Sequence, residues 1–249
     1  MADRAIEELV CQGYAIAPSG LPQDEIAAIA QAFDQLHADY TARHGHDWLK
    51  NLDEHHTIRL PLAYDARFLD LAANRTVMEI VGRLIGGKFI LNQQNGIVNP
   101  AGERYNQGAW HRDLPYQHFV SSRPLAINAL YCVDDFTIEN GATFVLPGSH
   151  KQEAYPSDAY IEKHAAQISA PAGSFVIVDC MTYHRGGFNR SPNKRRAVNH
   201  VYTIPLLRQQ IDIPAAVGER YADSATHELL GFRYPLARSI EEYLASRKK

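Results

Sequence analysis

The sequence comprises 249 residues, of which 45% are hydrophobic and 21% charged, and its formal net charge is −3 at pH 7. This composition is typical of a globular protein with a well-filled core and excludes a wholly disordered chain. Without a surplus of basic residues the chain has little charge with which to neutralise phosphates, so we expect no nucleic-acid partner.

The cysteines and the N-terminal segment indicate the compartment. Cys11, Cys132 and Cys180 are odd in number and far apart, which disfavours a disulfide framework or a zinc ribbon and favours a reducing cytosol. The first residues carry acids and lack the apolar stretch of a signal peptide. No apolar run approaches the roughly 18 residues of a membrane span. We therefore expect a cytoplasmic protein without a membrane partner.

The first third of the chain is predicted to be helical. Residues 21–44 place Pro22 near a helix start and then repeat apolar side chains at three- and four-residue steps. Residues 65–87 indicate two shorter helices, the second starting near Asn74 and ending at Gly86-Gly87.

From Lys88 onward the pattern is typical of β-structure. Short runs rich in β-branched and aromatic residues are separated by Gly, Pro, Asn and Asp: KFILNQQNGIVNP, RPLAINALYCVDDF, ATFVLPG, GSFVIVDC and AVNHVYTIPL. These runs predict a β-sandwich or jelly roll, and the closing SIEEYLASRKK predicts a helix. We expect residues 1–249 to form a single domain, mainly β with flanking helices. Its parts are a helical N-terminal third, a jelly-roll core at about 88–205 and a helical C-terminal tail.

The stretch AWHRDLPYQHF (109–119) carries a candidate metal site. If it is a strand, His111 and Asp113 project from one face and Arg112 from the other. His184 follows another apolar strand and precedes a Gly-Gly turn, so a jelly roll can bring it to the same place. Two histidines and one carboxylate occupy one face of an octahedral ion and leave positions open, which suits non-haem Fe(II). Structural zinc prefers four closed ligands.

Arg195 is a candidate for binding a co-substrate. It lies at the start of the strand after His184. Its planar guanidinium is well suited to bind a carboxylate through two parallel hydrogen bonds. A 2-oxoacid that chelates iron at one end offers such a carboxylate at the other. Arg196 is the alternative residue, and we expect one of the two arginines to face solvent.

Three motifs in this order carry a resemblance to a known family: WHRD, then ENGATFVLPGSHK (139–151), then HRGGFNRSPNKRRA (184–197). Together they resemble the phytanoyl-CoA dioxygenase family of Fe(II)- and 2-oxoglutarate-dependent oxygenases, which have a double-stranded β-helix fold. The resemblance covers about residues 88–205. It implies that His111, Asp113 and His184 are the catalytic iron ligands and that Arg195 binds the distal carboxylate of 2-oxoglutarate.

The sequence departs from the family pattern at two positions. A serine often found two residues after the distal histidine is Gly186 here, and a tryptophan common on the strand after HxD is absent from AINALYC. We expect Asn128 and Gln94 to supply replacement contacts to the co-substrate. Because halogenating relatives carry a small residue in place of the carboxylate, the presence of Asp113 favours oxygenation.

Two motifs have a structural interpretation. ENGATFVLPGSH contains turn chemistry at Asn140-Gly141 and Pro147-Gly148, so His150 is expected in a loop or behind the ligands rather than as a ligand. GRLIGGKF (82–89) nearly matches a phosphate-binding loop. It carries Phe89 where a hydroxyl belongs, and it ends a helix instead of opening one, so we interpret it as a helix cap.

Two further groups remain open. His55 and His56 in NLDEHHT are adjacent and would face opposite ways on a strand, so a solvated loop, or a segment over the active-site mouth, is favoured over a second metal site. Trp110 and Tyr116 are equally consistent with core packing and with substrate contact.

The sequence thus predicts an Fe(II)- and 2-oxoglutarate-dependent dioxygenase, an enzyme that hydroxylates a small molecule with O₂ and releases succinate and CO₂. Desaturation or ring closure would share its first step. The alternatives are a catalytically silent metal- or ligand-binding jelly roll and a cupin-like metal isomerase. A polar substrate or biosynthetic intermediate is favoured by candidate pocket residues, which are Asn92, Gln94, Tyr105, His118 and Arg123.

Overall fold

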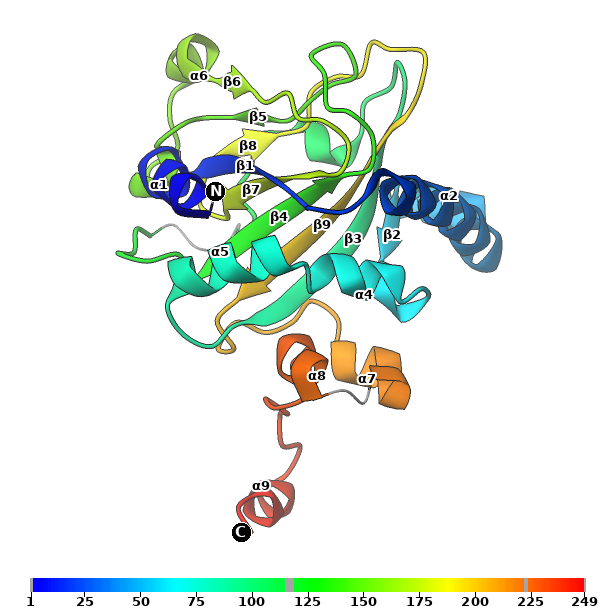
Figure 1. Cartoon of the computed structure of the whole chain (residues 1–249), viewed down its shortest axis with the longest axis vertical. Coiled ribbons are helices and arrows are strands. Elements are labelled where there is room, and N and C mark those ends of the chain that lie inside the picture. The colour runs from blue at the N-terminus through cyan, green and yellow to red at the C-terminus, as the bar shows by residue number, and fades with distance from the viewer. Residues whose placement is uncertain (1, 115–118, 222–223, 249) are drawn as a thin grey trace.

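A computed structural model describes residues 2–114, 119–221 and 224–248 of the chain. Two antiparallel sheets form its centre (Figure 1): a six-stranded sheet in the order β1-β7-β4-β9-β3-β2 and a three-stranded sheet in the order β6-β5-β8. The larger sheet consists of β1 (Tyr14–Pro18), β2 (Thr57–Arg59), β3 (Ile90–Asn99), β4 (Ala126–Cys132), β7 (Ser174–Asp179) and β9 (Arg195–Thr203). The smaller sheet consists of β5 (Phe144–Val145), β6 (Ala166–Gln167) and β8 (His184–Arg185).

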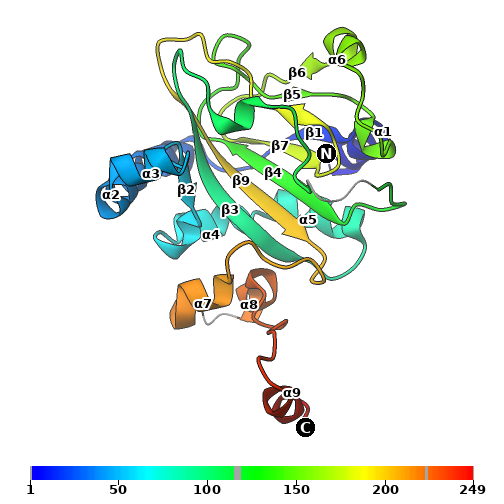
Figure 2. The ribbon, with the colours of Figure 1, turned by 180° about the vertical axis from the view of Figure 1, so that it is seen from behind.

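Helices cover one face of the larger sheet, and the smaller sheet lies on the other (Figures 1 and 2). The longer helices of the first third are α1 (Ala2–Gln12), α2 (Gln23–His44) and α5 (Arg75–Ile85), and the shorter ones are α3 (His46–Asn51) and α4 (Arg67–Ala72). Later in the chain come α6 (Asp158–His164), α7 (Ile213–Val217), α8 (Ser224–Leu230) and α9 (Ile240–Ser246). Figures 1 and 2 show α9 apart from the sheets. No helix in the described part of the chain is both long and apolar enough to cross a membrane.

Both predicted ends of the helix that begins near Asn74 are confirmed, and each carries a recognisable capping residue. Asn74 accepts hydrogen bonds from the backbone N–H groups of Thr76 and Val77, which start α5. Gly86 ends this helix with a φ of 67°, a conformation that favours glycine. The GRLIGGKF segment is therefore a helix cap.

The predicted β runs all contain strands, from β3 in the first run to β9 in the last. The first third, however, is not purely helical. Its β1 pairs with β7 at one edge of the larger sheet, and its β2 pairs with β3 at the other. The N-terminal third thus completes the sheet as well as covering it.

Strand alternation divides the larger sheet into two chemically different faces. Ile127, Ala129 and Tyr131 of β4 belong to the helix-covered core. Ala126 and Cys132 of the same strand belong instead to small clusters on the opposite face. Because Asn128 has the parity of Ala126, it also projects from that opposite face. We call it the site face, since the candidate metal ligands lie there.

Candidate metal centre

The backbone brings His111 beside His184. The N–H of His111 donates to the carbonyl of His184 over 2.9 Å, and the N–H of His184 donates back to that of His111 over 3.0 Å. Asp113 is held similarly, since its N–H donates to the Cys180 carbonyl over 3.0 Å. The expected strand around HRD is wrong: in the described residues it is reduced to this single β-bridge. The predicted opposite orientation of Arg112 nevertheless holds.

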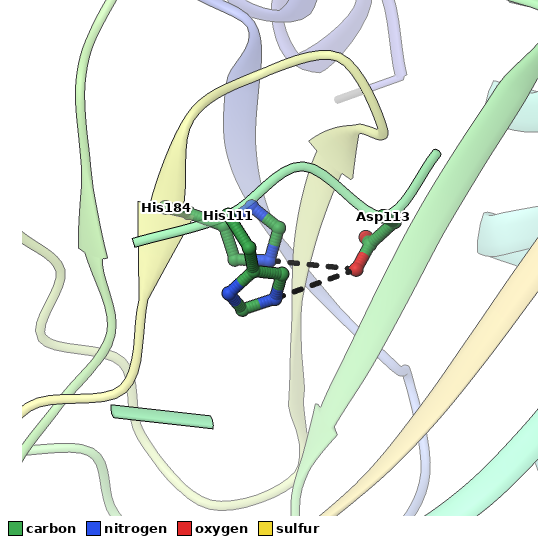
Figure 3. Close-up of side chains that lie close together, drawn as sticks. All are labelled: His111, Asp113 and His184. Carbon is green, nitrogen blue, oxygen red and sulfur yellow. Dashed lines mark ion pairs between the residues drawn. The ribbon is translucent and has the colours of Figure 1, made fainter. Parts of the chain in front are cut away.

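The three predicted ligands converge. His111, Asp113 and His184 each offer a ligand atom, and these atoms all lie within 4.8 Å of one another. Figure 3 shows both imidazoles pointing at one carboxylate oxygen, Oδ1 of Asp113, which is 3.8 Å from His111 Nε2 and 3.6 Å from His184 Nε2. Across the described ranges, no other group of three such residues is arranged to hold a metal ion. Two nitrogens and one oxygen at this spacing fit a divalent iron.

Both imidazoles are held in the tautomer that a metal requires. Nδ1 of His111 lies 2.8 Å from the Ala109 carbonyl, and Nδ1 of His184 lies 2.9 Å from the Thr182 carbonyl. A carbonyl can only accept, so each Nδ1 carries a proton, and each Nε2 is left facing Asp113 as the nitrogen that could bind a metal. Burial lowers the pKa of His184, which keeps its ring neutral.

Asp113 has a dedicated partner in Asn128, on the neighbouring strand β4. Nδ2 of Asn128 donates to Oδ2 of Asp113 over 2.9 Å. The other oxygen, Oδ1, is the one that faces the two imidazoles. Asn128 was predicted to contact the co-substrate, and the structure places it against the carboxylate ligand instead.

Arg112 is an anchoring residue behind the candidate ligands, and the sequence pattern did not show this role. Its side chain is fully buried, with 1% exposed, on the side opposite the ligands. Its guanidinium donates to four backbone carbonyls, those of Met181, Glu153, Gln152 and Ser149, at 2.7 to 3.3 Å. The alternation around HRD could have shown that Arg112 points inward, but a buried arginine whose hydrogen bonds all go to backbone carbonyls has no sequence signature. It fastens the ligand segment to two other segments of the chain.

Arg195 opens β9 on the site face, and only 3% of it is exposed. Its guanidinium carbon lies 4.0 Å from the ring centroid of Phe136, and Nη2 donates to the Tyr105 hydroxyl over 3.4 Å. Nε and Nη1 have no partner among the described residues, and none of the ion pairs found there involves Arg195. Burial lowers the pKa of Arg195, as expected for a cation without an anion beside it.

Arg196 points the other way. Its guanidinium forms ion pairs with Asp134 over 2.6 Å and with Asp34 over 2.7 Å. These charges are already satisfied, so of the two arginines only Arg195 has donors available. The expectation that one of the two arginines faces solvent is wrong: Arg195 is buried, and only 15% of the Arg196 side chain is exposed because its ion pairs hold it against Asp134 and Asp34.

Several predicted pocket residues do not join the site. Gln94 donates to the Phe68 carbonyl over 2.7 Å and accepts from the Leu62 N–H over 2.8 Å, so its amide is used on the helix-covered face. The prediction for Gln94 as a co-substrate contact is therefore wrong. Asn92 donates to the carbonyls of Leu207 and Arg208.

The other predicted contacts divide three ways. Arg123 lies beside Gly86 at the end of α5, away from the ligands. Tyr105 does reach the site face, next to Arg195. Tyr116 and His118 lie outside the described residues.

The alternative histidines and Trp110 have structural surroundings. His150 is buried with Nε2 3.2 Å from the Val10 carbonyl, as expected for a non-ligand. The rings of His55 and His56 lie 3.9 Å apart instead of facing opposite ways, in a turn before β2. Trp110 stacks on Tyr183 with ring centroids 5.2 Å apart.

The comparison with known families decides among the predicted classes. A sequence model of phytanoyl-CoA dioxygenase (PhyH) matches residues 9–197. The chain belongs to the phytanoyl-CoA dioxygenase family. Oxygenases of this family use iron(II) and 2-oxoglutarate, so the predicted cofactors and the general activity, an iron- and 2-oxoglutarate-dependent dioxygenase acting on a small molecule with O₂, are confirmed at this level.

Relatives and solved structures extend the similarity over most of this phytanoyl-CoA dioxygenase family member. The uncharacterised protein Rv1501 of Mycobacterium tuberculosis is 29% identical, over 97% of this chain and 90% of its own. Ectoine dioxygenase of Stutzerimonas stutzeri is 24% identical, over 88% and 84%. EctD from S. alaskensis, solved with 2-oxoglutarate and 5-hydroxyectoine, has a TM-score of 0.71 at 21% identity, covering 84% of this chain and 78% of that one. The carbocyclase SnoK from nogalamycin biosynthesis has a TM-score of 0.65 at 18% identity, over 82% and 85%. The predicted double-stranded β-helix is confirmed.

Proposed function

We propose that this dioxygenase is a hydroxylase in which His111, Asp113 and His184 hold Fe(II) and Arg195 binds the distal carboxylate of 2-oxoglutarate. The observation that carries the proposal is the buried guanidinium of Arg195, whose Nε and Nη1 have no partner in the described part of the chain. An unpaired buried cation is unfavourable by several kcal/mol. An incoming carboxylate would supply the missing charge and two acceptors.

The metal and 2-oxoglutarate, when bound, supply the oxidising chemistry, with succinate and CO₂ as co-products. The chain sets the charge and geometry. Two imidazoles and one carboxylate form the ligand set, and the backbone bridge between His111 and His184 fixes the spacing of two ligands. Exposure is uneven: 29% of the His111 side chain is accessible against 10% of His184. Substrate and O₂ would therefore approach from the side of His111.

Asn128 orients the carboxylate ligand in this proposal. Its hydrogen bond occupies Oδ2 of Asp113 and leaves Oδ1 for the metal. Such partners of metal ligands typically contribute about 10- to 100-fold in metal affinity.

The proposed substrate is a small polar molecule. Asn92, Gln94 and Arg123 no longer support a polar substrate, because their side chains do not lie beside the candidate metal ligands. Amides on the site face replace them: Asn95 donates to Gln93 over 3.3 Å, and its backbone N–H donates to Asn199 over 3.0 Å. The amide side chains of Gln93, Asn95 and Asn199 can donate and accept hydrogen bonds, which suits a polar substrate better than an alkyl chain.

We further propose that residues 1–249 act as one catalytic domain. β1 and β2 from the first third complete the larger sheet at both edges. After β9, the side chain of Gln209 donates to the carbonyls of Leu91 in β3 and Leu230 in α8. The parts before and after the jelly-roll core are thus bonded to it.

The test is an anaerobic titration of the metal-free protein with Fe(II) and then 2-oxoglutarate, followed by visible absorption. The wild type should develop a weak lilac charge-transfer band. His184→Ala should abolish it, and Arg195→Ala should require a higher 2-oxoglutarate concentration. Arg196→Ala is the matched control, because this neighbour is paired with Asp134 and Asp34. Metal binding without a band would contradict the proposal and favour a silent binder or an isomerase.

The hydroxylase assignment needs a substrate. A panel of small polar molecules, with ectoine included because a relative is an ectoine dioxygenase, can be screened by succinate release. With ¹⁸O₂, hydroxylation places one labelled oxygen in the product. Product without label would indicate desaturation or ring closure instead.

A further inference from the structure

Tyr105 and Gly186 fit together in the space next to Arg195. A Cβ built on Gly186 would lie 1.8 Å from the Tyr105 hydroxyl oxygen and 2.7 Å from the ring carbon that bears it. The backbone φ of Gly186 is not in the left-handed region, so its conformation does not require glycine. The tyrosine excludes a side chain at this position.

The tyrosine is held there by main-chain contacts. The N–H of Gly186 donates to the Gln107 carbonyl over 2.7 Å, and the N–H of Gly108 donates to the Tyr105 carbonyl over 3.0 Å. The segment after Tyr105 is therefore a short turn fastened to the strand that supplies His184. This anchoring places the hydroxyl at the guanidinium rather than leaving it free to turn away.

The hydroxyl has a proton to donate. Its oxygen accepts from Nη2 of Arg195, and the hydroxyl hydrogen is then available to another acceptor. Burial raises the pKa of Tyr105, so the phenol stays neutral at physiological pH. The unpartnered Nε and Nη1 of Arg195 are further donors at the same place.

We propose that Tyr105 binds the distal carboxylate of 2-oxoglutarate together with Arg195, and that Gly186 is glycine to make room for it. The inference rests on the proposed function, because it assumes that Arg195 holds this carboxylate. The phenol occupies the space of a side chain at position 186, where the family often has serine, so one hydroxyl takes the place of another. Tyr105 is thus a residue that selects the 2-oxoacid by its far end.

The first experiment compares two 2-oxoacids in the anaerobic titration. 2-Oxopentanoate has the same chain length as 2-oxoglutarate but a methyl group in place of the distal carboxylate. Tyr105→Phe should weaken 2-oxoglutarate binding about tenfold, the contribution of a hydrogen bond to a charged group. It should leave 2-oxopentanoate and Fe(II) affinities unchanged. Tyr160→Phe, a change at an exposed tyrosine on α6, should alter none of the three.

Two results would overturn the inference. Equal weakening of both oxoacids would mean that Tyr105 supports the site as a whole, and unchanged 2-oxoglutarate affinity would mean that its hydroxyl binds nothing. Failure of the proposed function is distinguishable, because then the wild type itself would give no 2-oxoglutarate-dependent band.

The second experiment exchanges the two hydroxyls. Gly186→Ser alone should weaken 2-oxoglutarate binding, since the new side chain collides with Tyr105. Tyr105→Ala alone should weaken it by loss of the donor. The double variant, with space and a hydroxyl restored, should bind more tightly than either single variant. A double variant whose losses simply add would contradict the exchange.

Discussion

Asn128 donates a hydrogen bond to Oδ2 of Asp113 over 2.9 Å, while Oδ1 of the same carboxylate faces His111 and His184. One oxygen is thus committed to the sheet and the other is available to a metal. A carboxylate fixed in this way cannot rotate to offer both oxygens. The relationship predicts monodentate ligation by Asp113 and, under the proposed function, a role for Asn128 in orienting this ligand.

Asn128→Ala should therefore reduce Fe(II) affinity about 10- to 100-fold, because the Asp113 carboxylate is freed to rotate. Competition with a chelator, without oxygen, measures the change. Asn199→Ala, an amide on the same face but bonded to the backbone of Asn95, is the control and should bind Fe(II) normally. Equal affinities for Asn128→Ala and wild type would show that Asp113 holds its position unaided.

Arg112→Met should lower the free energy of unfolding by about 3–5 kcal/mol, since four backbone carbonyls, two of them in buried hydrogen bonds, lose their donor. Urea unfolding of the metal-free protein measures this. Arg112→Lys should be intermediate, because an ammonium keeps the charge but not the planar fork. Arg104→Met, at an exposed arginine, should change stability by less than about 0.5 kcal/mol. A loss of under about 1 kcal/mol in Arg112→Met would contradict the role assigned to Arg112.

Arg195→Met, unlike Arg112→Met, should make the protein more stable. Removing a buried cation that lacks an anion should raise the free energy of unfolding of the protein without co-substrate by about 1 kcal/mol or more, while 2-oxoglutarate binding is largely lost. Arg196→Met should lower the free energy of unfolding by about 1–2 kcal/mol through loss of its ion pairs and leave 2-oxoglutarate affinity intact. Thermal unfolding measures the stability of both variants, and the anaerobic 2-oxoglutarate titration measures their co-substrate affinity. Destabilisation by Arg195→Met would mean that its charge is compensated within the chain.

His200 predicts a pH-dependent contribution to stability. Burial lowers the pKa of His200 from 6.5 to about 4, so between these values the unfolded chain binds a proton that the folded chain does not. The free energy of unfolding should then fall as the pH drops from 6.5 to 4, by up to about 3 kcal/mol from this residue. His200→Asn should lack that contribution.

The measurement compares urea unfolding of wild type and His200→Asn across this range. Asp179 acts with the opposite sign, because burial raises the pKa of its carboxyl from 3.8 to about 6; its protonation favours the folded state as the pH falls. Since Asp179 is present in both proteins, the difference between them isolates His200. Parallel pH profiles would contradict the prediction.

The convergence of the three candidate ligands was the most predictable feature of the molecule. His111, Asp113 and His184 are identifiable because iron demands particular donors, and those donors are few in the sequence. The strand assigned to His111 and Asp113 was not needed, since one backbone bridge and one further hydrogen bond place the same side chains. The ligand types that iron requires therefore identified the residues correctly, whereas local sequence propensity assigned them the wrong secondary structure.

The side to which Gln94 points depends on an irregularity in β3 that the sequence does not reveal. The pairing of β3 with β9 shifts between Leu91 and Gln93, and such a bulge changes which residues face which side. Gln94 then lies opposite His200 on the helix-covered face. β1 and β2 were missed for another reason: they are short, and they exist because a neighbouring strand pairs with them rather than through their own composition.

The β-bridge between His111 and His184 also determines when the metal centre can form. The bridge joins residues separated by most of the jelly-roll sequence. Closing so long a loop costs conformational entropy before the contact contributes any stability, so we expect this contact to form late in folding. A newly made chain therefore presents scattered histidines rather than an iron-binding site. We therefore expect the folded protein to take up iron, so that starving cells of iron changes the occupancy of the enzyme but not the yield of folded chain.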